Sequence, residues 1–312
     1  MTAARNLRPH IVGVVMIGDM EFERATMPSS PDFVNVAMLC AVKTSVLMTV
    51  YAGDDPAHFD VALRSVVAQR APADQIVLVC DGPLGEAHER VIERAIADGA
   101  QLDVLRLTAN VGLIGALNAG LDRCAGELVF RMDADDVSLP DRFGVQREFM
   151  EEHPEIGVLG TAMNEFDLDP QRPVRMKPVP ETHDEIVRRL PVRNPVNHPT
   201  VCFRRELVSA DGYPALRFVE DYFLWAQLIN RGVRFHNLQA PLVAYRFDAA
   251  TIGRRSGWTN FRNEMALRWW MHQRGMLGLP GFVAVGVVQA IVRFAPAGLQ
   301  RWLWRLTRRR TA

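Results

Sequence analysis

The chain has 312 residues, and its 36 basic and 36 acidic residues give a formal net charge of zero. This length allows one large α/β domain with additions or two modest domains. The balanced charge makes no electrostatic case for nucleic acid. No uncharged apolar run is long enough for a membrane span, and the N-terminus lacks the layout of a signal peptide. We therefore expect a cytoplasmic protein.

The first 43 residues show no clean hydrophobic period and contain the loop-like stretch ATMPSSPDF, so we expect a poorly ordered N-terminal extension. The four cysteines, Cys40, Cys80, Cys124 and Cys202, form neither a CxxC pair nor a cluster with zinc spacing. They are expected to be reduced thiols, mostly buried.

From residue 44 onward, strand and helix patterns alternate. Short apolar strands are predicted at 45–51, 75–82, 102–107 and 127–132, and helices at 59–69, 86–99 and 114–124. This alternation indicates parallel βαβ units, with helices on both faces of a mostly parallel, Rossmann-like sheet. Ligands of such sheets bind outside the carboxyl ends of the strands. Tyr51, Asp81, Asn110 and the Asp133–Asp136 cluster follow predicted strand ends, so we expect them to converge on one crevice.

The next helix is predicted to begin near Leu139, with Ser138 as its cap and Asp141 completing the spacing of a capping box. Further strands are predicted at 156–166 and 241–247, and a strand leading into a helix at 197–208. A helix is predicted at 218–232, with Glu220 and Asp221 near its start.

The segment FRMDADD places three carboxylates, Asp133, Asp135 and Asp136, directly after an apolar strand. Like charges this close repel unless a cation or water separates them. Hard oxygen ligands suit Mg²⁺ or Mn²⁺, and Mg²⁺ commonly completes its coordination with substrate phosphates. The alternative is a solvated acidic turn that leads into a helix. Because the cluster falls at the expected crevice, we favour a binding site for a metal ion and a diphosphate.

The ordered motifs SVLMTVY, SVVAQ, QIVLVCDG, NVGLIGALNAG, FRMDADD, NHPTVCFR and EDYFLW extend over residues 44–255. In this order they resemble family-2 glycosyltransferases of the GT-A fold. The FRMD-x-DD, PDRF and EDYxLW segments are most similar to those of bacterial exopolysaccharide and O-antigen transferases of the amylovoran-biosynthesis type. The resemblance implies an inverting, metal-dependent transfer of one sugar from a nucleotide-sugar to a glycan acceptor in surface polysaccharide assembly.

The resemblance also implies roles for matching residues. Tyr51 and Asp81 would hold the nucleotide base, and Asp81 accepting from N3–H of uracil would favour a UDP-sugar. Asp133 would lie near the ribose, Asp135 would bind Mn²⁺ or Mg²⁺, and Asp221 would be the catalytic base.

Two asparagines, Asn110 and Asn118, match a loop and helix motif of the family, which places Asn110 with the nucleotide-binding residues. The usual arginine of that motif is Leu117 here, so its contacts are not carried over.

Each role has a structural alternative. Glu220 and Asp221 also suit the positive end of a helix dipole, Asp81 before Gly82 also suits a simple turn, and Tyr51 also suits the core at a strand end.

Other charged or titratable residues are candidates for contacts with the acceptor or the diphosphate, or for structural ion pairs. His198 in NHPT, together with Glu220, is a candidate contact for the acceptor or the diphosphate. Arg254 and Arg255 suit a loop that closes over a diphosphate, or else a solvated basic turn. Arg131 lies inside an apolar strand and needs a partner if buried, for which the neighbouring aspartates are candidates.

The C-terminal tail, residues 256–312, has no acidic residue after Glu264. It mixes tryptophans and aliphatic residues with arginines, and the eight arginines after Glu264 are Arg268, Arg274, Arg293, Arg301, Arg305, Arg308, Arg309 and Arg310. This composition favours a helix on an anionic membrane surface, which would place the enzyme on the cytoplasmic face of the inner membrane near a lipid-linked acceptor. The alternative is a helix packed on the protein itself or on a second subunit. We expect a nucleotide-binding half at 44–137 and an acceptor-binding half at 138–255.

Rival functions fit less well. A dinucleotide-dependent oxidoreductase needs GxGxxG after the first strand, where this chain has VYAGDDP. A sugar-nucleotide pyrophosphorylase needs a basic, glycine-rich loop there, and that is missing as well. The alternative of a non-catalytic protein that binds nucleotide-sugars or glycans is not excluded by the sequence, because fold alone does not determine function.

Overall fold

The computed structural model describes residues 42–247 and 258–294. The predicted extension at 1–43 falls almost wholly outside these residues, as do Cys40, Arg254 and Arg255.

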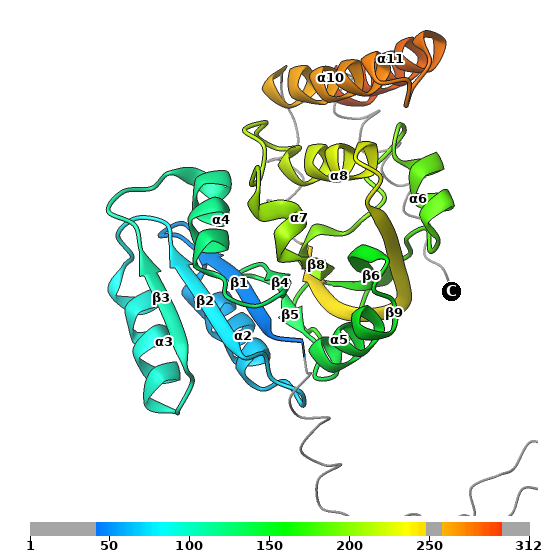
Figure 1. Ribbon diagram of the computed structural model, residues 1–312. Helices are drawn as coiled ribbons and strands as arrows, with labels where there is room; N and C mark the ends of the chain where they lie inside the picture. The colour runs from blue at the N-terminus through cyan, green and yellow to red at the C-terminus, as the bar shows by residue number, and fades with distance from the viewer. Residues whose placement is uncertain (1–41, 248–257, 295–312) are drawn as a thin grey trace, which may run out of the picture. The chain divides into compact units, whose positions relative to one another are not determined.

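The helices and strands follow the predicted alternation closely in the first half (Figure 1). In chain order they are β1 (Thr44–Val50), α2 (Pro56–Val67), β2 (Gln75–Cys80), α3 (Glu86–Ala97), β3 (Leu102–Arg106), α4 (Gly112–Arg123), β4 (Leu128–Met132), β5 (Val137–Ser138), α5 (Arg142–Glu152), β6 (Ile156–Phe166), β7 (Arg175–Lys177), α6 (His183–Arg189), the 3₁₀ helix η1 (His198–Thr200), β8 (Cys202–Arg204), α7 (Arg205–Ser209), α8 (Glu220–Asn230), β9 (Arg234–Arg246), α10 (Trp258–Gln273) and α11 (Leu279–Phe294).

The strands form one sheet in the order β3-β2-β1-β4-β8-β6-β9-β5, with β7 paired to β6. Strands β3, β2, β1 and β4 are parallel, as the βαβ pattern predicts. Beyond β4 the sheet becomes mixed, because β8 runs antiparallel to both β4 and β6 whereas β9 is parallel to β6. The carboxyl ends of the first four strands therefore share one edge.

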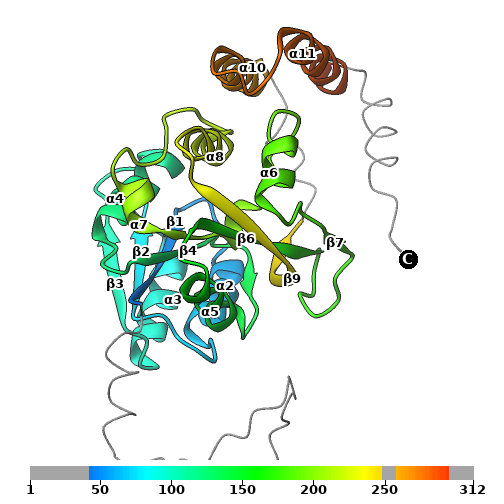
Figure 2. The ribbon, with the colours of Figure 1, turned by 45° about the vertical axis from the view of Figure 1, so that its right-hand side comes forward.

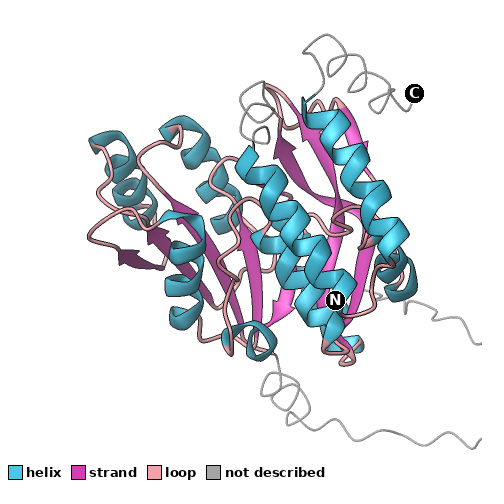
Figure 3. Cartoon of the chain, turned by 90° about the horizontal axis from the view of Figure 1, so that it is seen from above, coloured by secondary structure: helices cyan, strands magenta, loops and turns pink. Residues whose placement is uncertain are grey.

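Side chains of the central strands alternate between two hydrophobic layers. In β1, Leu47 packs in the layer that contains α4 and α8, whereas Val46 and Met48 pack in the layer that contains α2 and α3. This follows from the two-residue period of a strand, and it explains why the strands read as continuous apolar runs. Seen from above, helices lie on both sides of the strands (Figure 3).

The predicted cap at Ser138 is wrong. Ser138 lies in β5, where it pairs with Val243 of β9, and its hydroxyl accepts a hydrogen bond from Gln69. Helix α5 begins only at Arg142, and the Asp141 carboxylate pairs with Arg70 instead of closing a capping box. A tertiary strand pairing has replaced the local capping motif.

The two described helices of the tail differ in their surroundings. Helix α10 joins the core, since Leu267 and Met271 are fully buried in the same cluster as Trp225 of α8. Helix α11 packs beside α10 (Figure 2), where the ring of Phe282 contacts Trp269. Within the described ranges, no helix is long and apolar enough to cross a membrane.

The cysteine prediction is confirmed for the three described cysteines, which are free and buried. Burial raises the pKa of the Cys80 thiol to about 11 and the pKa values of Cys124 and Cys202 to about 12. These thiols are therefore protonated and unreactive at neutral pH.

Candidate active site

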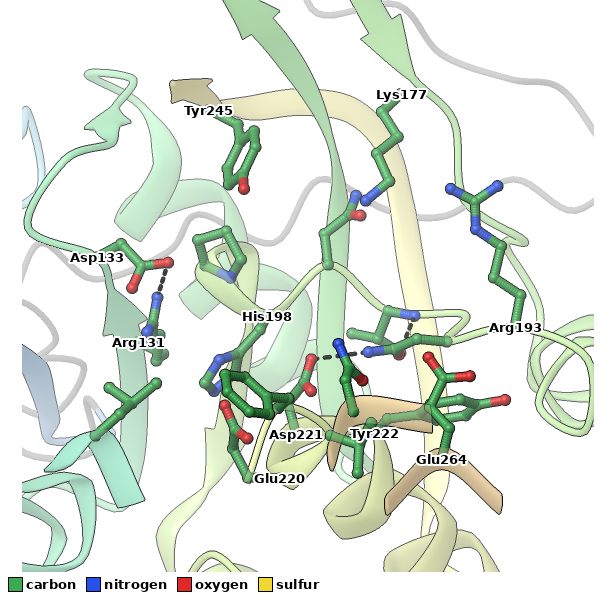
Figure 4. A pocket seen from close by; sticks show the side chains of 18 of the residues that line it. Arg131, Asp133, Lys177, Arg193, His198, Glu220, Asp221, Tyr222, Tyr245 and Glu264 are labelled. Atoms are coloured by element: carbon green, nitrogen blue, oxygen red, sulfur yellow. Dashed lines mark hydrogen bonds and ion pairs between the residues drawn. The ribbon is translucent and has the colours of Figure 1, made fainter. Parts of the chain in front are cut away.

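A pocket of about 500 Å³ lies where β4 ends, between that strand, the segment before η1 and the start of α8 (Figure 4). Its lining contains Asp133 and Asp135 of the acidic loop, His198, and the paired carboxylates Glu220 and Asp221. Five of the residues predicted from the sequence therefore meet in one pocket.

The acidic loop begins directly after β4, and its first carboxylate is held by a buried arginine. Arg131, only 1% exposed, forms an ion pair with Asp133, so the predicted partner of this buried charge is confirmed. A guanidinium removed from water requires such a partner, because an unpaired buried charge is very costly. The Arg131 side chain therefore fixes Asp133 at the edge of the pocket.

Arg246, at the end of β9, holds Asp135 and Asp136 of the acidic loop through hydrogen bonds. Its backbone N–H donates to Asp136 Oδ1 at 2.8 Å, and its Nε donates to the carbonyl of Asp135 at 3.1 Å. Asp136 is fully buried, so it fastens the loop to β9 and does not lead into a cap at Ser138. Burial, together with repulsion from Asp133 and Asp135, holds the pKa of Asp136 well above its usual range.

These three aspartates suit a divalent cation. One ligand oxygen from each of Asp133, Asp135 and Asp136 lies within 4.8 Å of the others. Asp136 Oδ2 is buried and has no hydrogen-bond partner among the residues that the structure describes. A cation at this position would offset the mutual repulsion and the desolvation of the carboxylates. The donor set, all hard oxygen atoms, fits Mg²⁺ or Mn²⁺.

The second acidic pair lies at the first turn of α8. Asp221 Oδ2 accepts a hydrogen bond of 2.7 Å from Asn194 Nδ2, and Asn194 Oδ1 accepts one from the backbone N–H of Val196. This chain fixes the orientation of the Asp221 carboxylate within the pocket. Burial first, and repulsion from Asp221 second, raises the pKa of Glu220 to about 7. Two adjacent carboxyls thus have different surroundings: Asp221 accepts a side-chain hydrogen bond from Asn194, whereas backbone hydrogen bonds only partly offset the burial of Glu220.

His198 lies beside this pair and is neutral. Its Nε2 lies 3.2 Å from the Tyr213 hydroxyl, and its pKa falls well below the usual range because burial and the nearby Arg131 both disfavour the cation. Asn118 anchors Tyr213 by bonding both its backbone N–H and its carbonyl. His198 is therefore held as a hydrogen-bonding group and not as a charge.

Tyr51, Asp81 and Asn110 follow the neighbouring strands β1, β2 and β3 at the same sheet edge, but they do not line this pocket. Asp81 is 5% exposed, and its two oxygens accept the backbone N–H groups of Val111 and Gly112. Asn110 donates to the Asp81 carbonyl, while Tyr51 is 42% exposed. Asp81 thus holds the loop before α4, and its contact with a nucleotide base stays a prediction.

Sequence patterns gave no signal for several residues of the pocket. These residues are Lys177, Arg193, Asn194, Phe218, Tyr245, Glu264 and Arg268. Among them, Asn194 orients Asp221. Phe218 has a φ of 72°, a left-handed backbone conformation that residues other than glycine rarely adopt, and the residue is 42% exposed. Such backbone strain is concentrated at functional sites. The sequence did not predict it, because the residue two positions before the EDY motif is a phenylalanine and not a glycine.

A family model described as glycosyl transferase family 2 matches residues 45–210. The chain belongs to this family. Both the predicted family and the enzymatic class, a glycosyltransferase, are thereby confirmed, and neither the pyrophosphorylase nor the non-catalytic alternative is favoured.

Curated relatives of this family-2 glycosyltransferase are themselves named as glycosyltransferases. The amylovoran biosynthesis glycosyltransferase AmsE of Erwinia amylovora is 38% identical over 224 residues, which cover 72% of this chain and 83% of AmsE. The Escherichia coli UDP-Gal:alpha-D-GlcNAc-diphosphoundecaprenol beta-1,3-galactosyltransferase is 29% identical over 269 residues, which cover 86% of this chain and 97% of that enzyme.

Solved structures show the same fold, which is the predicted GT-A fold. S. aureus TarS 1–349 in complex with UDP-GlcNAc is similar with a TM-score of 0.62 and 17% identity, over 83% of this chain and 77% of that chain. The mannosyltransferase PcManGT from Pyrobaculum calidifontis, in complex with GDP-Man and Mn²⁺, has a TM-score of 0.52 and 15% identity, over 85% of this chain and 79% of that chain.

Proposed function

We propose that this family-2 glycosyltransferase transfers one sugar from a UDP-sugar to a hydroxyl of a lipid-linked glycan acceptor, with inversion, in the assembly of a bacterial surface polysaccharide. One observation carries the proposal. A single pocket contains both the acidic cluster at the end of β4 and the oriented carboxylate of Asp221. These are the two groups that glycosyl transfer requires, one for the leaving diphosphate and one for the acceptor proton.

In this proposal the half formed by residues 44–137 holds the nucleotide. Tyr51, Asp81 and Asn110 contact the base and its surroundings, and Asp133, fixed by Arg131, lies near the ribose. The galactosyltransferase relative, whose name includes UDP-Gal, and the TarS complex with UDP-GlcNAc support a UDP-sugar as donor.

Asp135 would hold the divalent cation, Mn²⁺ or Mg²⁺, with Asp133 and Asp136 beside it. When bound, the cation stabilises the charge of the leaving diphosphate. Arg246 keeps the loop in position through its bonds to Asp135 and Asp136. The Mn²⁺ complex of PcManGT supports this assignment.

The half formed by residues 138–255 binds the acceptor, and Asp221 removes the proton from its hydroxyl. Asn194 stabilises the ionised carboxylate and holds its orientation, as a general base requires. A base on the face opposite the leaving group gives inversion, as in glycoside chemistry. Glu220 and His198 line the acceptor side as positioning groups, and the predicted Arg254 and Arg255 lie outside the described residues.

The enzyme is proposed to dock on an anionic bilayer through α11. Every exposed position of this helix as far as residue 291 is apolar, and these positions form one stripe: Leu279, Pro280, Val283, Ala284, Val287, Val288 and Ile291. The chain after Glu264 contains eight arginines and no acidic residue. An exposed apolar stripe in a segment of sequence rich in arginine suits the interface of an anionic membrane.

Replacing Val283 and Val287 together with asparagine is expected to weaken binding to phosphatidylglycerol vesicles by about tenfold or more, because both side chains lose their apolar contact with lipid. Both valines are more than half exposed, so the fold should be retained. A vesicle co-sedimentation assay at low salt measures the effect. The matched control replaces Val61 and Val145, exposed valines of α2 and α5, in the same way. Equal losses in both variants, or no binding by the wild type, would refute membrane docking through α11.

The proposed reaction is tested by screening UDP-sugars against a lipid-diphosphate monosaccharide in the presence of Mn²⁺ or Mg²⁺. The product gains the mass of one sugar, and its anomeric configuration is opposite to that of the donor.

A further inference from the structure

The wall of the pocket on the far side of Asp221 carries two cations, Lys177 and Arg193. In Figure 4 Asp133 and Arg193 lie at opposite sides of the pocket with Asp221 between them, and Lys177 lies toward the side of Arg193. The acidic cluster and this basic pair are therefore separate ends of one pocket.

The backbone positions of both residues are set by neighbouring elements of the fold. Lys177 ends β7 and stands opposite Met163 of β6, a buried, uncharged residue that also lines the pocket. Arg175, two residues earlier and on the same face, pairs with Glu165 at 3.2 Å. Arg193 directly precedes Asn194, whose side chain bonds to Asp221. The position of Arg193 is thus linked to that of the base.

Two further arginines also line the pocket. Arg131 pairs with Asp133, and Arg268 pairs with Glu264 of the same helix at 2.8 Å. Lys177 and Arg193 add positive charge on the side of Asp221 away from the acidic cluster. The charge changes along the pocket, from the carboxylates at the end of β4 to a mixed group beyond the base, where Lys177 and Arg193 lie on the same side as the Glu264 carboxylate that pairs with Arg268.

We propose that Lys177 and Arg193 form a subsite for a phosphate group of the acceptor, an inference that rests on the proposed function. In an inverting transfer the acceptor enters on the face opposite the leaving diphosphate. With the leaving group at the acidic cluster and the acceptor hydroxyl at Asp221, an anion bound beyond Asp221 belongs to the acceptor. A guanidinium and an ammonium together suit phosphate oxygens through charge-assisted hydrogen bonds, whereas neutral sugar hydroxyls do not require them.

The tail helices border the same pocket. Gln289 of α11 and Glu264 of α10 line it, while the apolar stripe of α11 is exposed. One helix thus contributes to the pocket and also carries the surface proposed to meet lipid. A phosphate attached to a lipid would have its charge beside Lys177 and Arg193 and its chain toward α11, which accounts for cations at this end of the pocket.

The test uses the full chain saturated with UDP and Mn²⁺, so that the donor end is occupied. Decyl diphosphate, which carries no sugar, is titrated by calorimetry, and an uncharged decyl glycoside is titrated in parallel. Replacing Lys177 and Arg193 together with glutamine is expected to weaken decyl diphosphate binding by about tenfold or more, since two charge-assisted contacts are lost. The matched control, Arg188→Gln, removes an arginine of α6 that lines a different hollow, and it should bind like the wild type.

Three results would overturn the subsite. They are failure of the wild type to bind decyl diphosphate, equal weakening in the Arg188→Gln control, and equal loss of affinity for the uncharged glycoside. Failure of the proposed function is recognised separately, because UDP with Mn²⁺ would then not bind in the first step. The titration is in that case repeated without UDP, and an unchanged affinity of the double variant would again overturn the subsite.

Discussion

Replacing Asp221 with asparagine is expected to lower the rate of sugar transfer by about 10²–10⁴-fold, the usual contribution of a general base. Asparagine keeps the shape of the side chain but does not accept the proton of the acceptor hydroxyl. The affinity for UDP with Mn²⁺ should stay unchanged, because Asp221 lies away from the acidic cluster in the pocket (Figure 4). Initial rates and calorimetric titration of UDP measure the two effects.

The control for this variant is Asp211→Asn. Asp211 is exposed and pairs with Arg231 outside the pocket, so its replacement should leave both rate and affinity intact. Transfer by the Asp221→Asn enzyme at the wild-type rate would show that another group takes the proton. Parallel loss of UDP affinity would instead place Asp221 at the donor.

Replacing Asp135 with asparagine is expected to weaken UDP binding in the presence of Mn²⁺ by about tenfold or more, since a charged ligand of the cation is lost. The affinity measured in EDTA should be the same for this variant and the wild type, because the carboxylate acts only through the cation. Calorimetric titration of UDP in both conditions provides the comparison.

Asp141→Asn is the matched control for the acidic loop. Asp141 lies a few residues further along the chain, where it is exposed and pairs with Arg70. It should bind UDP with Mn²⁺ like the wild type. If Asp135→Asn kept a full response to Mn²⁺, the cation would have to be held elsewhere.

Local patterns were sufficient for the first half of the fold. The strands β1, β2 and β4 are buried on both faces, so they read as continuous apolar runs. The helices between them carry one apolar face each. Because parallel strands end at one edge, the sequence also predicted that Asp133 and Asp135 would lie beside a crevice.

Features that depend on distant contacts were not predictable. Ser138 fits a capping motif locally, but pairing with Val243 determines its structure. The backbone N–H of Arg246 donates a hydrogen bond to Asp136, which lies 110 residues earlier in the sequence. Asn194 lies in a segment without hydrophobic period, and only the fold places its amide against Asp221.

The surroundings of the two tail helices were not predictable from the sequence either. From the sequence we predicted one kind of environment for the whole tail, although the segment of α10 contains many polar residues and that of α11 is almost wholly apolar. Packing separates them, since Leu267 of α10 is fully buried whereas Val283 and Val287 of α11 are more than half exposed. Burial of this kind depends on tertiary contacts with α8, which a single-helix pattern does not contain.

The most direct test of the central claim is sugar transfer itself, with and without a divalent cation. The wild-type chain is incubated with a UDP-sugar panel and a lipid-diphosphate monosaccharide, and the acceptor is analysed by mass spectrometry. The account predicts that one UDP-sugar adds a single sugar in Mn²⁺ or Mg²⁺ and that EDTA abolishes the addition. Equal transfer in EDTA, or transfer from GDP-sugars with none from any UDP-sugar, would contradict it.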